Sequence, residues 1–218
     1  MPDEIRVAFH QEMNEIDQKV VRLFALVSEG VAAATDALLA GDREAARSLV
    51  DRDKVIDSLY TDVEELVQRQ FALQSPMAKD MRFLLSVLRI VPELERSGDL
   101  AEHIAQRAAR GLSTALTPRI RGLIEQMGAV GTEMWREAAD AYVDRNGDVA
   151  VHLNERDDEL DELHVSLTAE LVSGQLTVPI ALEMALVARF YERLGDHAVN
   201  IAERIRYIAE GDVAGSGS

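Results

Sequence analysis

The segment Glu95-Arg96-Ser97-Gly98-Asp99, followed by Ile104-Ala105, decides the fold of this chain because it occurs twice. Its second copy is Glu192-Arg193-Leu194-Gly195-Asp196, followed by Ile201-Ala202, at an offset of 97 residues. In a helix, side chains four positions apart share a face, with Cβ atoms about 6 Å apart. Each copy therefore presents a glutamate and an aspartate together, which is a possible site for a hard metal ion.

A second pair of matching segments extends the repeat upstream. Asp51-Arg52-Asp53 with Asp57 recurs as Glu155-Arg156-Asp157 with Asp161, at an offset of 104 residues. The two offsets differ by seven residues, which is close to two helical turns, so equivalent faces stay in phase. The sequence therefore predicts two similar helical halves.

Composition agrees with a helical, globular chain. Of 218 residues, 47% are apolar, only 5% are aromatic and five are proline, which favours an all-α protein over a disordered or all-β one. The length suits one domain or two of about 100 residues each. The repeat favours two three-helix bundles, over residues 5–111 and 118–210, with a disordered tail at 211–218.

Charge and cysteine content exclude several classes of function. The net charge of −16 argues against a nucleic-acid partner, which needs clustered lysine and arginine, and favours cations or basic protein surfaces. With no cysteine there is no disulfide, thiol catalysis or thiolate metal site. The N-terminus lacks the pattern of a signal peptide, and no apolar run of about 20 residues stands out. We expect a cytoplasmic protein with at most peripheral membrane contact.

Apolar periodicity predicts six helices, and the breaks between them fall at matching places. Gly41 and Asp42 are expected to end the first helix and cap the second, and Asn146-Gly147-Asp148 to do the same in the other half. Pro76 and Thr177 mark the starts of the third and sixth helices. The sixth has the clearest inner seam, with spacings of four and three typical of a coiled coil. Its members are Val187, Tyr191, Leu194, Ala198, Ile201, Ile205 and Ile208.

The acidic pairs are the candidate metal ligands. In an up-down-up bundle, neighbouring helices bring the pairs of each half together, and close carboxylates repel unless a cation joins them. Oxygen ligands without thiolates suit Mg, Mn, Ca, Zn or iron. The alternative is that these side chains are simply solvated on the outer face of a helix. The eight predicted ligands are Asp53, Asp57, Glu95, Asp99, Asp157, Asp161, Glu192 and Asp196.

Glycine and histidine positions bear on the same question. A glycine in mid-helix costs about 1 kcal/mol relative to alanine, so Gly98 and Gly195 require a reason: close approach of a neighbouring helix, or a bound ion. A ferritin-like di-iron site needs Glu-x-x-His on two helices, whereas only Asp161-Glu162-Leu163-His164 approximates it, once. His103 lies one turn after Asp99, but its repeat counterpart is an asparagine. A di-iron oxidase is therefore disfavoured.

Together these motifs resemble the PhoU family of accessory proteins of bacterial phosphate-specific transport. The duplicated Glu-Arg-x-Gly-Asp, the upstream Asp-x-x-x-Asp pairs and the element Pro76-Met-Ala-Lys-Asp80-Met-Arg82 carry the resemblance, which covers about residues 5–210. It implies two pseudo-symmetric three-helix bundles, a homodimer, and metal clusters held by the acidic pairs. Asp80 and Arg82 have no twin in the second half, so their role is open.

The resemblance also implies a function. It predicts a non-catalytic regulator that links the phosphate-specific ABC transporter, through its ATPase subunit, to a sensor histidine kinase and represses the starvation response when phosphate is plentiful. No phosphate-binding loop, nucleophile elbow or Ser/His/Asp pattern appears in the sequence. The competing hypotheses are a carboxylate-bridged metal enzyme or metal store, and a helical adaptor without metal.

Overall fold

The computed structural model describes residues 2–73 and 78–210, and this part of the chain folds into six α-helices without a β-strand. The all-α prediction is therefore confirmed. A single 3₁₀ turn, Leu112–Ala115, connects the two halves. The helices are α1 (Pro2–Ala40), α2 (Arg43–Leu73), α3 (Lys79–Ala109), α4 (Pro118–Asp144), α5 (Val149–Val172) and α6 (Val178–Glu210).

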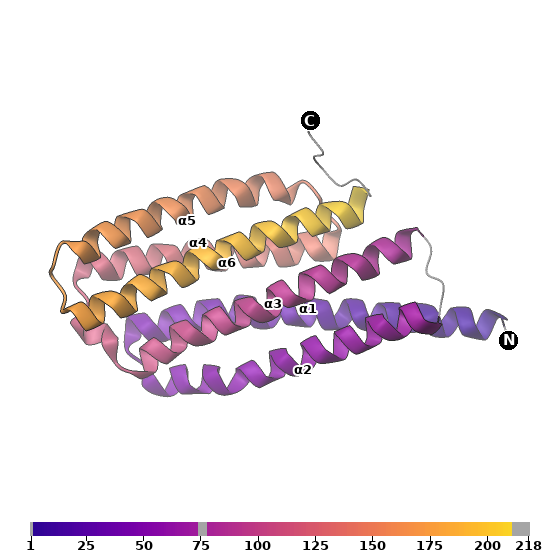
Figure 1. Cartoon of the computed structure of the whole chain (residues 1–218), viewed down its shortest axis with the longest axis horizontal. Helices are drawn as coiled ribbons and strands as arrows, with labels where there is room; N and C mark the ends of the chain where they lie inside the picture. The colour runs from indigo at the N-terminus through magenta and orange to yellow at the C-terminus, as the bar shows by residue number, and fades with distance from the viewer. Residues whose placement is uncertain (1, 74–77, 211–218) are drawn as a thin grey trace.

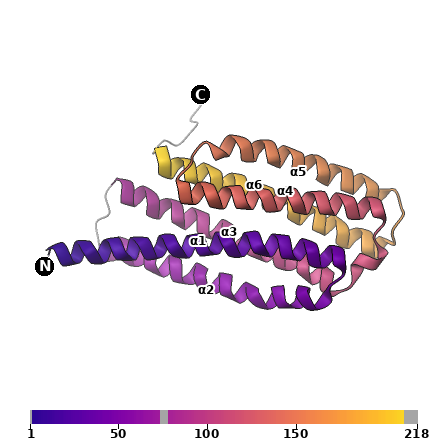
Figure 2. The same ribbon diagram turned by 180° about the vertical axis from the view of Figure 1, so that it is seen from behind.

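The helices form two antiparallel three-helix bundles that pack along their length. Helices α1, α2 and α3 form the first bundle and α4, α5 and α6 the second. Between the bundles, α1 packs on α4 and α3 packs on α6, so these four helices are central (Figures 1 and 2). Helices α2 and α5 lie on opposite outer sides of the molecule, each covering one face of its own bundle.

The inner seam of α6 is buried as its spacing predicts. Its apolar positions are at most 9% exposed, and burying a side chain of valine, leucine or isoleucine stabilises by about 1.5 to 3 kcal/mol. On the equivalent stripe of α3, the counterpart of Leu194 is Ser97, which is also fully buried. A buried serine needs a hydrogen-bond partner, and Ser97 finds partners within α3 and on α6.

Polar contacts also join the two bundles. The hydroxyls of Thr35 in α1 and Tyr191 in α6 are 2.7 Å apart in the buried interface. At one end, Glu183 of α6 accepts hydrogen bonds from Arg107 Nε of α3 at 3.1 Å and from Nη1 of Arg110, the C-cap residue of that helix, at 2.7 Å. Arg107 also lies over the ring of Phe190. These contacts supplement the apolar packing and hold α3 against α6.

The turn between α1 and α2 has the predicted residues. Gly41 adopts the left-handed conformation with φ of 71°, and Asp42 Oδ1 accepts hydrogen bonds from the backbone N–H groups of Glu44 and Ala45. Glycine suits this position because it has no Cβ to clash. The first helix stop is therefore confirmed.

The prediction for the matching turn of the second half was wrong by two residues. The left-handed residue there is Arg145, with φ of 55°, and not Gly147. Arg145 stands 104 positions after Gly41, so the turn follows the upstream register of the repeat. Its strained backbone is held because Arg145 Nη1 donates to the Tyr142 carbonyl at 3.0 Å and Nη2 to Asp17 Oδ1 at 2.5 Å. Asp148 is the N-cap residue of α5 as predicted, but its side chain makes no capping hydrogen bond; Asn146 Oδ1 instead accepts from the Asp148 backbone N–H at 3.0 Å.

Other predicted boundaries have mixed outcomes. Thr117 caps α4 by accepting from Ile120 N at 3.3 Å, with Pro118 as the first helical residue, and α6 begins directly after Thr177. Pro76 and the predicted tail at 211–218 lie outside the described residues.

Helix α1 departs from the expectation that no segment is apolar enough to span a bilayer. Its stretch Phe9–Ala40 passes that test by length and composition. Half of the window is buried inside the fold, where α1 packs against α2, α3 and α4. The central helix of a bundle is apolar on several faces for this reason.

Candidate functional site

The acidic pairs of the first bundle meet where α2 crosses α3. Asp53 of α2 and Asp99 of α3 approach so closely that one carboxylate oxygen of each, together with one of Glu102, lies within 4.8 Å of the others. Asp57 and Glu95 lie one turn further along the same helices and act electrostatically on this group. All four predicted ligands of the first half therefore belong to one acidic cluster.

The environment of this cluster disfavours the charged form of its carboxyl groups. Burial and, in decreasing order, the charges of Asp99, Asp57 and Glu102 together raise the pKa of Asp53 from 3.8 to about 6. Burial also raises the pKa values of Glu95 and Asp99. Carboxylates behave in this way when they are crowded and partly desolvated without a cation. A divalent ion between them would remove the repulsion.

Glu102 is a member of the first cluster that the sequence did not predict. It lies three residues after Asp99, so it shares that face of α3, but its repeat counterpart is Val199. A search for repeated pairs cannot find a ligand that occurs only once. The i, i+3 spacing from a predicted ligand is the sequence signal that would have indicated it.

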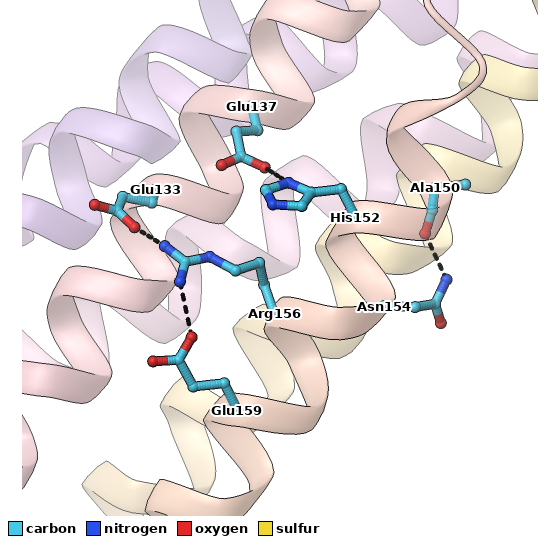
Figure 3. A network of polar contacts seen from close by, with 7 residues as sticks. All are labelled: Glu133, Glu137, Ala150, His152, Asn154, Arg156 and Glu159. Atoms are coloured by element: carbon cyan, nitrogen blue, oxygen red, sulfur yellow. Dashed lines mark hydrogen bonds and ion pairs between the residues drawn. The ribbon is translucent and has the colours of Figure 1, made fainter.

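The second cluster depends on how α5 is fixed against α4. Arg156 of α5 forms ion pairs with Glu133 of α4 and with Glu159 on its own helix, while His152 Nδ1 lies 2.7 Å from Glu137 Oε2 (Figure 3). These residues occupy the α4 side of α5. Asp157 follows Arg156 in the chain and therefore points about 100° further round α5, where it lies against α6.

The four predicted ligands of the second half also act on one another. Burial raises the pKa of Asp157 from 3.8 to about 6, with the charges of Asp196, Asp161 and Glu192 contributing. Asp157 Oδ1 and Glu192 Oε2 are buried and make no hydrogen bond within the described residues. Unpartnered buried carboxylate oxygens are costly, and a metal ion would satisfy them. The donor set therefore fits a cation.

The two clusters nevertheless differ in geometry. Only Asp53, Asp99 and Glu102 form a group of three potential ligand atoms within 4.8 Å in the described part of the chain. In the second bundle the carboxylates interact through their charges, but three oxygens do not converge in the same way. The first cluster is the more completely assembled of the two.

The mid-helix glycines have the predicted close approach. A Cβ on Gly195 would stand 2.3 Å from Asp157 Oδ1 and 2.9 Å from Leu160 Cδ2. A Cβ on Gly98 would stand 2.7 Å from Ile56 Cδ1 and 3.4 Å from Asp53 Oδ1. In both halves glycine lets the outer helix, with its aspartate, approach the motif helix.

The alternative that these acidic side chains are solvated on the outer face of a helix holds only in part. Asp57, Asp161 and Asp196 are exposed, whereas the Glu192 side chain is only 14% exposed. Glu192 is covered because the outer helix α5 packs over this face of α6 and because Arg189 pairs with it. The partly buried members are Asp53, Glu95, Asp99 and Asp157.

The histidines that the sequence singled out do not make a di-iron site. His164 acts on Glu192 only through its charge, which lowers the pKa of that carboxyl against the larger effect of burial. His103 lies beside the first cluster, where its charge lowers the pKa of Asp99, and its ring faces Phe190 at 5.4 Å. Neither histidine is part of the group of converging ligand atoms.

Comparison with known proteins identifies the family that this architecture matches. The family model for the PhoU domain matches the chain twice, over residues 20–108 and 124–205. Each match spans one three-helix bundle and contains one copy of the Glu-Arg-x-Gly-Asp segment. The duplication found in the sequence is therefore a duplication of this domain.

Individual relatives agree over nearly their full length. The chain is 31% identical over 210 residues to "Phosphate-specific transport system accessory protein PhoU homolog 2" of Mycobacterium tuberculosis, covering 95% of this chain and 99% of that protein. The crystal structure of PhoU from Pseudomonas aeruginosa superposes with a TM-score of 0.87 at 29% identity, covering 94% of this chain and all of the other. The phosphate transport system regulatory protein PhoU from Streptococcus pneumoniae gives 0.83 at 25% identity, covering 95% and 99%.

Proposed function

Because this chain belongs to the PhoU family, we propose that it is a non-catalytic regulator of phosphate uptake that represses the phosphate-starvation response when phosphate is plentiful. The observation that carries the proposal is the domain match in both halves, together with relatives named as accessory or regulatory proteins of phosphate-specific transport. We assign it a cytoplasmic location, where it meets the transporter from the inner side of the membrane.

We propose that each bundle binds a divalent metal or iron through its acidic cluster. Asp53, Asp99 and Glu102 supply the first site, with Asp57 and Glu95 beside them. Asp157, Asp161, Glu192 and Asp196 supply the second. The burial and crowding that raise the pKa values of Asp53 and Asp157 support this assignment, since a cation bound between the carboxylates would favour their charged forms.

Two protein partners follow from the regulatory role. We propose that the chain binds the ATPase subunit of the phosphate-specific transporter and a sensor histidine kinase, and that it forms a homodimer. A net charge of −16 suits basic surfaces on these partners, and attraction between exposed charges weakens as salt rises. Partner binding should therefore depend on ionic strength.

A genetic experiment tests the role. Deleting the chain in its host should activate phosphate-starvation genes at high external phosphate, and reintroducing it should restore repression. A quadruple variant with Asp53, Asp57, Asp157 and Asp161 changed to asparagine tests the metal sites, with Asp140→Asn as the matched control on an exposed position of α4. Normal repression in the deletion strain would contradict the regulatory role.

The competing function is a carboxylate-bridged metal enzyme or metal store. The clusters contain crowded carboxylates of the kind that iron binds, which is the one observation in its favour. Oxidation of bound Fe²⁺ with turnover by the purified protein, combined with normal repression in the deletion strain, would establish it instead.

A further inference from the structure

A polar cleft of about 350 Å³ lies between the bundles, beside the second acidic cluster. Residues from α3, α5 and α6 line it, so it spans both copies of the repeat. Carboxylates and guanidinium groups both face it, together with one histidine. The lining residues are Glu93, Arg96, Asp157, Arg193, Asp196, His197, Val199 and Asn200.

His197 is held in one orientation at the floor of this cleft. Its side chain is 8% exposed, and its Nδ1 lies 2.9 Å from Ser97 Oγ, across the α3–α6 interface. Ser97 has one hydroxyl proton, which it donates to the Glu93 carbonyl oxygen at 2.7 Å. Ser97 Oγ must therefore accept from His197, so Nδ1 carries the imidazole proton and Nε2 carries the lone pair.

The lone pair of Nε2 faces a carboxylate oxygen with no proton between them. Nε2 lies 3.6 Å from Glu93 Oε2, and this buried carboxylate oxygen has no hydrogen-bond partner in the described chain. This separation exceeds a hydrogen bond. It is close to the distance of about 3.4 Å between two ligands on a tetrahedral metal with bonds of about 2.1 Å. Two facing lone pairs at this distance are what a shared cation would join.

Neighbouring groups orient both ligands. The hydrogen bond between His197 Nδ1 and Ser97 Oγ turns Nε2 toward Glu93. Arg96 Nη1 lies 3.3 Å from the other oxygen of Glu93, Oε1, which orients the carboxylate and leaves Oε2 free. Supporting hydrogen bonds of this kind are typical around metal ligands.

We propose that Glu93 and His197 form a third metal site, which bridges the two bundles and takes an imidazole-binding divalent ion such as Zn²⁺ or Co²⁺. Glu93 of α3 supplies one ligand and His197 of α6 the other. Water completes the coordination, and the charge of Asp196, which lines the same cleft, acts on Glu93. Three carboxylates against two guanidinium groups leave the cleft attractive to a cation.

This site breaks the symmetry of the repeat. In the other copy of the repeat, the positions equivalent to His197 and Glu93 are Leu100 and Phe190, which are apolar. The third site therefore exists once in the chain, whereas the acidic clusters exist twice. It also uses nitrogen, which Zn²⁺ and Co²⁺ accept readily and Mg²⁺ does not.

The test is a titration of the full-length protein with Zn²⁺ and, separately, with Mg²⁺. His197→Leu places at this position the residue found in the other half, so the variant should fold. Wild type should bind one more equivalent of Zn²⁺ than His197→Leu, with equal Mg²⁺ binding by both. Glu93→Gln keeps the imidazole and should weaken the same Zn²⁺ site by about tenfold or more.

Nuclear magnetic resonance tests whether the bound Zn²⁺ contacts His197 Nε2. Zn²⁺ should shift the Nε2 signal of His197 in the wild type, and that signal is identified by its loss in His197→Leu. Ser97→Ala, which removes the partner of Nδ1, should weaken the site without removing it. Equal Zn²⁺ stoichiometry in wild type and His197→Leu, or an unmoved Nε2 signal, would overturn the proposal even if the acidic clusters bind metal.

Discussion

Replacing Asp157 by asparagine should stabilise the metal-free protein, contrary to the usual effect of changing a half-buried polar residue. Burial and the surrounding carboxylates raise the pKa of Asp157 from 3.8 to about 6, so the charged form is disfavoured in the folded state. A shift of about two pH units corresponds to at most about 3 kcal/mol. Because the side chain is partly solvated, we expect about 1 kcal/mol, or about 2 to 4 °C in melting temperature.

The sign of the pH dependence follows from the same shift. The folded state binds a proton more tightly than the unfolded state, so the stability of the metal-free protein should fall as pH rises from about 4 to about 6. Asp53 contributes in the same direction. Asp157→Asn should reduce this loss of stability with rising pH. A saturating divalent ion should make the wild type more stable as pH rises, and it should have a smaller effect on the variant.

Chemical denaturation at pH 4, 5, 6 and 7, with and without metal, measures these effects. Asp140→Asn is the control, since it removes one charge from an exposed side chain of α4 that is not among the charges acting on Asp157, and it should change stability by no more than about 0.5 kcal/mol. Destabilisation of the metal-free protein by Asp157→Asn at pH 7, or an unchanged pH profile, would refute the account of a strained carboxylate cluster.

Two further substitutions test packing. Gly195→Ala should displace Asp157 and weaken metal binding in the second bundle. Gly122→Ala, at a helical position with open space, should leave metal binding unchanged and stabilise the protein by about 1 kcal/mol. Equal effects of the two substitutions on metal binding would contradict the close approach of Asp157 to Gly195. Ile201→Ala on the buried seam should cost about 2 to 5 kcal/mol in urea denaturation, against about 0.5 kcal/mol for Glu203→Ala, and similar losses would show that the faces are assigned wrongly.

The repeat carried most of the information about the fold. Each half encodes the same helix order, so a weak apolar pattern in one half is supported by the equivalent pattern in the other. The interrupted apolar stripe of α3, for example, is in register with the regular apolar seam of α6. The error at the second turn had a physical origin. Glycine favours the left-handed conformation, but hydrogen bonds from Arg145 to Tyr142 and Asp17 hold a non-glycine residue in it here. Such tertiary compensation is invisible in local sequence.

The candidate sites were predictable only where they obey the repeat. The eight paired carboxylates could be found because they recur. Helices α2 and α5 carry four of them, and these helices pack beside α3 and α6, which carry the other four. Glu102 has no twin, and the facing of Glu93 and His197 depends on how α3 crosses α6, which periodicity within one helix does not specify. Residues that break the symmetry of a duplicated protein are therefore those that sequence reasoning misses.

Anomalous X-ray diffraction from crystals grown with Mn²⁺ tests the central claim most directly. The account predicts one anomalous peak or more among Asp53, Asp99 and Glu102, and another beside Asp157 and Asp196. Crystals of the Asp53→Asn, Asp157→Asn double variant should lack both. Absence of anomalous density at the carboxylates in the wild type, at Mn²⁺ concentrations that saturate binding in solution, would contradict it.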